Sequence, residues 1–96
     1  MINKEILLDA AKYIEEHGWR NTGGYGEEGG PRCLLGAIKS TLGVANVYSP
    51  NWEEYFNIWE DLAILWHIRP EIWNDHVASN AEEVITRLRT TAQNLP

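Results

Sequence analysis

The chain has little cysteine, few basic residues and no long hydrophobic run. It contains one cysteine, Cys33, so no disulfide can form within it, and a lone thiol is typical of a reducing compartment. No apolar run approaches the roughly 20 residues of a membrane-spanning helix. The N-terminal residues carry acids in their first turns and lack the apolar core of a signal peptide. These absences predict a cytoplasmic protein with no membrane association.

Basic residues are outnumbered, because 8 Lys and Arg face 14 Asp and Glu, for a net charge of −6. Nonspecific nucleic-acid binding needs clustered cations that displace counterions, so we expect no nucleic-acid partner. The acids form scattered pairs, which is typical of solvated helix faces rather than of a nucleic-acid mimic. The 96 residues suit one domain, 1–96, with a single modest core. The three histidines and Cys33 show no paired metal-ligand spacing, so we expect no metal and no cofactor.

The stretch Ser49–Trp66 predicts a long amphipathic helix, with Ser49 as N-cap and Pro50 in its first turn. Its apolar residues recur at steps of three and four: Trp52, Tyr55, Phe56, Trp59, Leu62, Ala63 and Trp66. At about 100° per residue the apolar arc covers roughly half of the circumference. We therefore expect this Trp-rich helix to lie centrally, with other helices packed on two of its flanks.

The remaining helices are predicted by apolar periodicity and by their cap residues. They cover Lys4–His17, Pro31–Leu42, a short turn at Pro70–Trp73 that Asn74 and Asp75 stop, and a last helix after the N-cap Asn80. The first helix has Asn3 as N-cap and Gly18 at its C-terminal end, and its inner face is predicted to be Leu7, Ala10, Ala11 and Ile14. The predicted inner face of the last helix is Val84, Ile85, Leu88 and Ala92. The sequence thus predicts an all-α fold, a compact bundle of about four helices around the Trp-rich helix. A β-pair between Thr22–Tyr25 and Val44–Tyr48 is the minor alternative.

Arg20–Arg32 contains five glycines and predicts a surface loop, with a partner-binding loop that uses Tyr25 as the alternative. The loop lacks the Gly-Lys-Ser/Thr of a phosphate-binding loop. Gly36 stands inside a predicted helix, where it costs about 1 kcal/mol relative to Ala. A close neighbour would explain it, and we expect that neighbour to be a tryptophan.

Three segments together resemble a family of small domains of unknown function from actinobacteria and their phages. The segments are AAKYIEEHGW (10–19), GGPRCLLGAI (29–38) and IWNDHVASNAEEVITRL (72–88). The resemblance covers nearly the whole chain and implies a fold and an origin but no activity. The matching positions are Gly18, Trp19, Cys33, Gly36, Ala37, Trp73, Asn74 and Asp75.

A thiol enzyme is one functional alternative. A cysteine at a helix N-terminus can have a stabilised thiolate, His76 would be its base, and Asp75 or Asn74 would orient that base. However, Asp75 and His76 are adjacent in sequence, and Cys33 is in register with the apolar side of its helix, as a buried structural cysteine would be.

Protein binding is the function that we expect. Ile64 and Ile68 point away from the main apolar arc, and with Tyr25 they form the expected contact surface, with Glu60 and Asp61 adding specificity. The resemblance to phage domains implies that the partner is a host bacterial protein, which a phage-type accessory protein would modulate or inhibit in the cytoplasm of a bacterial or phage-infected host cell. A homodimer that covers the same patch is the alternative. An uncovered aromatic cleft would instead favour a small ligand.

Overall fold

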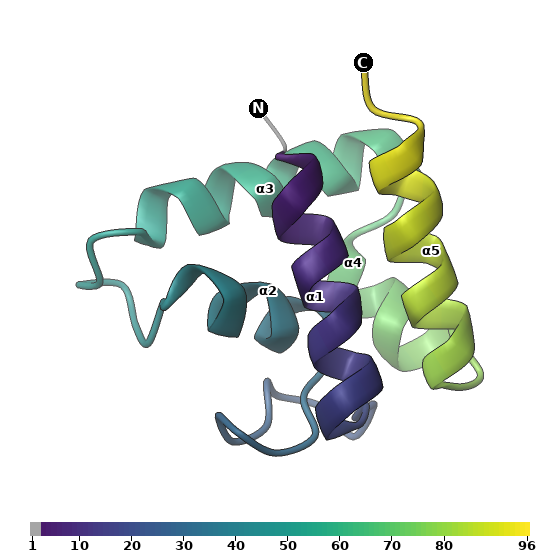
Figure 1. Cartoon of the computed structure of the whole chain (residues 1–96), viewed down its shortest axis with the longest axis horizontal. Helices are drawn as coiled ribbons and strands as arrows, with labels where there is room; N and C mark the ends of the chain where they lie inside the picture. The colour runs from purple at the N-terminus through teal and green to yellow at the C-terminus, as the bar shows by residue number, and fades with distance from the viewer. Residues whose placement is uncertain (1–2) are drawn as a thin grey trace.

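The computed structural model describes residues 3–96, and this part of the chain is built of helices (Figure 1). The predicted all-α fold is confirmed. The helices are α1 (Lys4–His17), α2 (Leu34–Leu42), α3 (Trp52–Trp66), α4 (Pro70–Ile72), a π-helix η1 (Trp73–Val77) and α5 (Ala81–Gln93).

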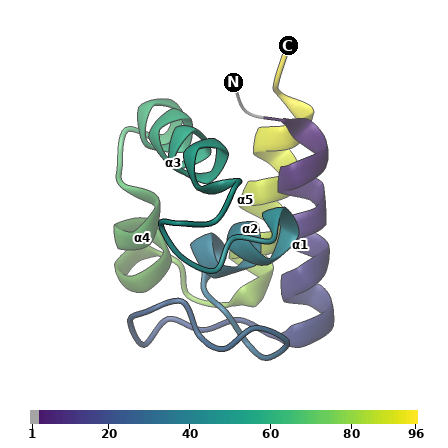
Figure 2. The ribbon, with the colours of Figure 1, turned by 90° about the vertical axis from the view of Figure 1, so that its left-hand side faces the viewer.

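α1 has the bounds and the caps that the sequence predicts. The Asn3 side chain accepts a hydrogen bond from the Glu5 N–H at 2.8 Å, and Gly18 ends the helix with a φ of 97°. Its buried face consists of Ile6, Leu7, Ala10, Ala11 and Ile14. α1 makes the most extensive helix contacts in the chain, with α5 on one side and α2 on the other (Figures 1 and 2).

α3 runs crosswise to α1 and α5 (Figure 1), and its buried residues form a single stripe. Tyr55, Ile58, Leu62 and Trp66 are buried, whereas Phe56 is 43% exposed. Its contacts with α2 and α4 are less extensive than those of α1. The central place in the packing therefore falls to α1, and part of the aromatic face of α3 stays open.

The start of α3 differs from the prediction, since Ser49 does not cap it. Asn51 is the N-cap residue, and its side chain donates to the Leu42 carbonyl at 2.7 Å. The Ser49 hydroxyl instead accepts from the N–H groups of Ala45 and Asn46. Ser49 therefore closes the preceding turn, and Asn51 ties α3 to the end of α2.

The prediction that Asn74 and Asp75 end a helical turn is wrong. They lie inside η1, where the Ala78 N–H donates to the Trp73 carbonyl at 2.9 Å. π-helical turns are rare and occur frequently at functional sites. The wider turn keeps Asn74 and Asp75 in helical geometry, which aims their side chains at the loop and at α2.

α5 begins as predicted. The Asn80 side chain accepts from the Glu83 N–H at 3.0 Å, and the Glu83 carboxylate accepts from the Ser79 N–H. The predicted inner face is confirmed, because Val84, Ile85, Leu88 and Ala92 are buried.

The two ends of the glycine-rich loop, residues 20–32, lie side by side. The helix that follows it, α2, begins at Leu34 rather than at the predicted Pro31. The Arg20 N–H donates to the Arg32 carbonyl at 3.2 Å, in an isolated parallel bridge between Trp19 and Arg32. Within residues 3–96, no strand pair joins Thr22–Tyr25 to Val44–Tyr48.

Candidate ligand-binding cleft

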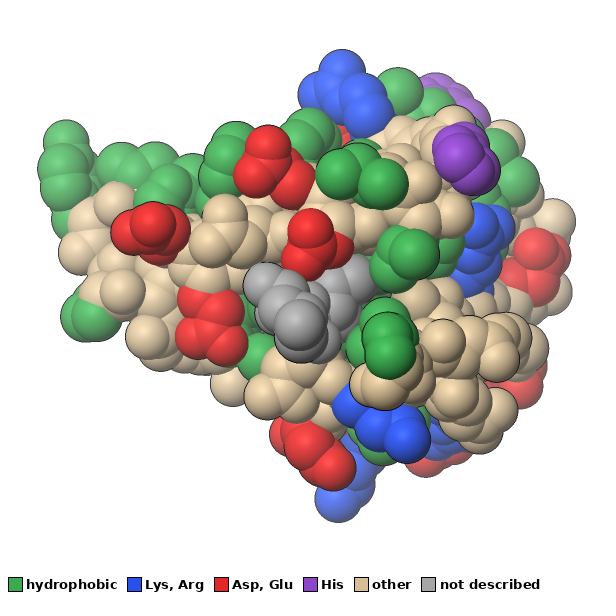
Figure 3. All heavy atoms as spheres, turned by 90° about the horizontal axis from the view of Figure 1, so that it is seen from above, with side chains coloured by type: hydrophobic (Ala, Val, Ile, Leu, Met, Phe, Trp, Pro, Cys, Tyr) green, Lys and Arg blue, Asp and Glu red, His purple; other side chains and the backbone are tan. Residues whose placement is uncertain are grey.

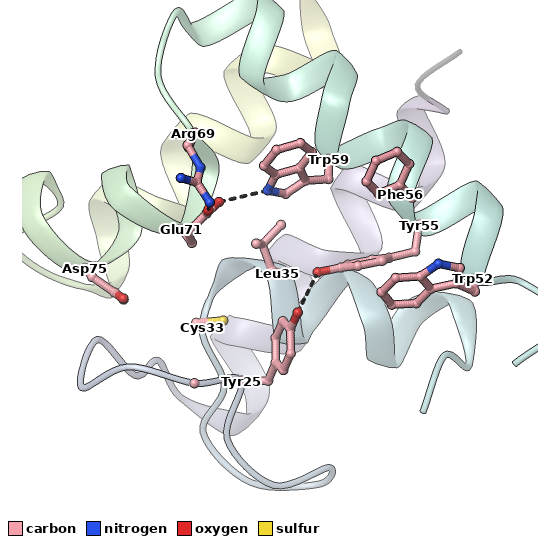
Figure 4. Close-up of a pocket in the computed structure, with 11 residues that line it drawn as sticks. Tyr25, Cys33, Leu35, Trp52, Tyr55, Phe56, Trp59, Arg69, Glu71 and Asp75 are labelled. Atoms are coloured by element: carbon pink, nitrogen blue, oxygen red, sulfur yellow. Dashed lines mark hydrogen bonds and ion pairs between the residues drawn. The ribbon is translucent and has the colours of Figure 1, made fainter. Parts of the chain in front are cut away.

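A cleft of about 510 Å³ opens between α3, the glycine-rich loop and the α4–η1 segment (Figure 4). Aromatic side chains form one end and charged side chains the other. It is lined by Gly24, Tyr25, Cys33, Leu35, Trp52, Tyr55, Phe56, Trp59, Arg69, Glu71 and Asp75.

α3 supplies the aromatic wall, because its aromatic residues recur at steps of three and four on the side that lines the cleft. These residues are Trp52, Tyr55, Phe56 and Trp59. Phe56 and Trp59 stack with their ring centroids 5.9 Å apart. The Trp59 indole N–H donates to the Glu71 carboxylate at 2.8 Å. This bond fixes the orientation of Trp59 and ties the wall to α4.

Tyr25 brings the loop into the cleft (Figure 4). The Tyr55 hydroxyl donates to the Tyr25 hydroxyl at 3.3 Å. The ammonium of the buried Lys39 lies 3.8 Å from the centroid of the Tyr25 ring. Burial raises the pKa of Tyr55 and lowers the pKa of Lys39. Tyr25 therefore has a defined place against α2 and α3.

Gly36 has a close neighbour, but it is the loop backbone and not the expected tryptophan. A Cβ at Gly36 would lie 2.5 Å from the Tyr25 carbonyl oxygen. That oxygen accepts from the Cys33 N–H at 3.2 Å and from the Arg32 guanidinium at 3.4 Å. Gly36 thus permits the loop to dock on the first turn of α2.

The charged end of the cleft comes from α4, η1 and the residue before them. Arg69 and Glu71 form an ion pair at 2.6 Å. Asp75 is half-buried and its carboxylate accepts from the Asn74 amide at 2.8 Å. Figure 4 shows the Asp75 side chain pointing toward the interior of the cleft.

Asn74 is fully buried and joins three segments of the chain. Its Oδ1 accepts from the Trp19 indole N–H at 2.7 Å and from the Leu34 N–H at 3.0 Å. Its amide donates to the Arg20 carbonyl at 3.1 Å as well as to Asp75. Asn74 therefore holds the end of α1, the start of α2 and η1 together.

The positions that carry the family resemblance have structural roles near this junction. Gly18 adopts a positive φ before Trp19, Gly36 admits the loop, and Ala37 is buried. Trp73 is a core residue whose ring lies 5.5 Å from that of Trp66. Trp19 is half-buried and lies outside the aromatic cleft.

Cys33 lies in the floor of the cleft, 6% exposed, with its sulfur accepting from the Gly36 N–H at 3.3 Å. Burial raises the pKa of its thiol, and the Asp75 carboxylate adds to that rise. This is opposite to the stabilised thiolate that the enzyme hypothesis requires. Asp75 shares the cleft with Cys33, whereas His76 is exposed and does not line it.

The expected contact residues do not form one surface. Tyr25 lines the cleft, while Ile64 is 71% exposed and lies about 140° around α3 from Trp59. Ile68 is half-buried against the core. Glu60 is exposed and Asp61 half-buried. In Figure 3, acidic and hydrophobic side chains alternate over the upper surface of α3.

Sequence reasoning missed Trp52, Phe56 and Trp59 as site residues, because their periodicity is also that of core residues. Five aromatic residues on one helix face were more than a small core needs, and that excess was the available signal.

Fold and cleft together define a small all-α domain with an aromatic cleft. A family of unknown function, DUF6197, matches residues 3–94, and the chain belongs to this family. No match was found among curated proteins or among solved structures. Across residues 3–96, no helix is long and apolar enough to cross a membrane. The same residues contain no cluster of three or more His, Cys, Asp or Glu side chains suited to a metal ion.

Proposed function

We propose that this chain is a protein-binding module and that its aromatic cleft is the binding surface. The observation that carries the proposal is a wall of indole and phenyl rings that is held in place yet uncovered. Such a cleft also suits a small ligand, which is the alternative occupant. Tryptophan and tyrosine dominate binding energy at protein interfaces, since they bury a large area at a low entropic cost. Trp59 is fixed by Glu71, and Phe56 by its stacking on Trp59.

The protein-binding role fits the chemistry better than a thiol enzyme does. A nucleophile needs a stabilised thiolate and a base within reach. Cys33 is buried with a raised pKa, and His76 faces solvent outside the cleft. We extend the proposal to a cytoplasmic accessory protein of phage type that modulates a host bacterial protein. The family resemblance and the net charge of −6 support that extension.

Two single substitutions on α3 test which surface binds. Phe56→Ser removes an exposed ring from the cleft wall, and Ile64→Ser removes an exposed side chain that lies two turns further along the same helix, about 80° around it, and does not line the cleft. Both should fold, because both side chains are solvent-exposed, and circular dichroism checks this. We expect affinity capture from bacterial lysate, quantified by mass spectrometry, to lose its enriched protein with Phe56→Ser and to retain it with Ile64→Ser.

The reverse pattern would move the interface to the outer face of α3, around Ile64 and Glu60. Equal enrichment by all three chains would contradict binding through either surface. Light scattering distinguishes the homodimer alternative, which requires twice the mass of the 11.0 kDa chain.

A further inference from the structure

The charges that face the cleft are not balanced. Arg69 is paired with Glu71, and Glu71 also accepts the Trp59 indole N–H, so both are engaged. Asp75 lines the same cleft and takes part in no ion pair within the described residues. Its one hydrogen bond comes from the neutral Asn74 amide. The lining therefore carries one uncompensated carboxylate.

Two cations near the cleft do not compensate Asp75. Lys39 is buried, with its ammonium against the Tyr25 ring, and does not line the cleft. Arg32 directs its guanidinium to the Ser40 hydroxyl, at 2.6 Å, and to the Tyr25 carbonyl. Neither cation therefore pairs with the Asp75 carboxylate.

The walls of the cleft suit a cation as well. Aromatic faces attract cations, and planar guanidinium groups stack on them while also pairing with carboxylates. Two lining rings already hold a cation of this chain: the Arg69 guanidinium lies 5.9 Å from the Trp59 ring centroid, and Lys39 lies against Tyr25.

We propose that the occupant of the cleft is an arginine-containing segment of the partner protein. The guanidinium enters between the aromatic wall and the Asp75 carboxylate, while an apolar residue beside the arginine covers Phe56 and Trp52. The net charge of −6 favours the approach of a basic segment. This inference rests on the proposed protein-binding function and names the chemistry of its partner.

Three matched peptides test the inference on the full chain: acetyl-Leu-Arg-Leu-amide, the same peptide with citrulline, and the same peptide with glutamate. Citrulline keeps the shape of arginine and removes its charge. Binding is followed through the indole N–H signals of Trp52 and Trp59 in ¹H–¹⁵N NMR spectra. We expect the arginine peptide to bind about tenfold more tightly than the citrulline peptide, because a charge-assisted pair replaces a neutral one.

Asp75→Asn should reduce this ratio to about twofold or less, since the amide keeps an acceptor for Asn74 but loses the charge. Asp9→Asn is the matched control on the exposed side of α1, and it should keep the tenfold ratio.

Equal affinity for the arginine and citrulline peptides would overturn the cationic occupant but leave an apolar peptide site in place. Tightest binding of the glutamate peptide would overturn it as well. If no peptide shifts either indole signal and Phe56→Ser leaves protein capture unchanged, the cleft is no binding surface, and both proposals fail.

Discussion

Asn74 shows how much one buried amide can organise. Its two acceptor positions and its two donor hydrogens are all used, by Trp19, Leu34, Arg20 and Asp75. A buried polar side chain is stabilising only when its hydrogen-bonding capacity is satisfied in this way. The same contacts place the start of α2, and with it Cys33, against the segment that carries Asp75.

Asn74→Ala should lower the free energy of unfolding by about 2–4 kcal/mol, because it leaves the Trp19 indole and Leu34 N–H groups without an acceptor and opens a void. Urea unfolding followed by tryptophan fluorescence measures the change. Asn21→Ala, at an exposed position of the loop, is the control and should change the value by less than about 0.5 kcal/mol. A loss below about 1 kcal/mol for Asn74→Ala would show that the amide is dispensable.

The buried thiol of Cys33, in the floor of the cleft, makes the free energy of unfolding depend on pH. Burial raises its thiol pKa, so the folded chain keeps the proton to a higher pH than the unfolded chain, whose thiol has a pKa of about 8.5. The folded state therefore binds more protons in this range, and the stability from the buried thiol is complete below about pH 8.5. It is lost as the pH rises from there through the folded-state pKa. The raised pKa of Tyr55 acts in the same sense at higher pH.

We expect iodoacetamide to label Cys33 in the folded chain at least about tenfold more slowly than in the urea-unfolded chain at pH 8.5, because only the exposed thiolate reacts. The mass of the intact chain reports the labelling, which one thiol makes unambiguous. Cys33→Ala should lack the part of the stability decrease that begins near pH 8.5. Equal labelling rates in the two states would identify an accessible thiol and reopen the enzyme hypothesis.

At the scale of elements, the glycine-rich loop forms one side of the cleft, with Tyr25, because the loop docks on α2. The Tyr13 hydroxyl donates to the Gly30 carbonyl and accepts from the Gly29 N–H, which holds the far part of the loop to α1. Gly36 admits the near part. The loop is therefore tied to two helices rather than free at the surface.

Gly36→Ala tests this docking, because two effects oppose each other. Alanine favours the helix by about 1 kcal/mol, but its Cβ would lie 2.5 Å from the Tyr25 carbonyl oxygen. Since backbone cannot move aside as a flexible side chain can, we expect a net loss of about 1–3 kcal/mol in thermal or urea unfolding. Gly30→Ala is the control, with its nearest contact at 3.6 Å, and should be close to neutral. A stabilised Gly36→Ala chain would show that the loop is not docked.

Prediction from sequence succeeded for elements whose signals are local. The caps Asn3 and Asn80 and the buried faces of α1 and α5 follow from spacing within one helix. The π-helical turn had no local signal, because its wider hydrogen bonding is stabilised by what Asn74 contacts elsewhere. The start of α3 was misplaced for a related reason, since Ser49 has the residue type of a cap but bonds backward into the preceding turn.

In the whole molecule, the contacts between helices divide the fold into a tightly packed part and a less tightly packed part. α1, α2 and α5 share the most extensive contacts, whereas α3 adds a single buried stripe. Local opening is easiest where few apolar contacts must be broken. The cleft lies at the boundary between the two parts, which suits a surface that adapts to a partner.

Amide hydrogen exchange should reveal this division. We expect the amides of Leu7, Ile14 and Leu88 to exchange only through global unfolding and those of the first two turns of α3 to exchange faster. Exchange at increasing urea, read by NMR, distinguishes global from local opening. Uniform protection along α3 and α1 would contradict the division and describe one cooperative unit.

The sequence by itself determined the all-α class, the helices α1 and α5, and the aromatic character of α3, because caps and periodicity act over a few residues. The sequence also singled out Tyr25, which lines the cleft. Only the tertiary structure decided which face of α3 stays uncovered and that His76 lies apart from Cys33. These outcomes depend on hydrogen bonds between residues far apart in the sequence, such as Trp19 with Asn74 and Trp59 with Glu71. The spacing of residue types within one helix does not reveal such pairings.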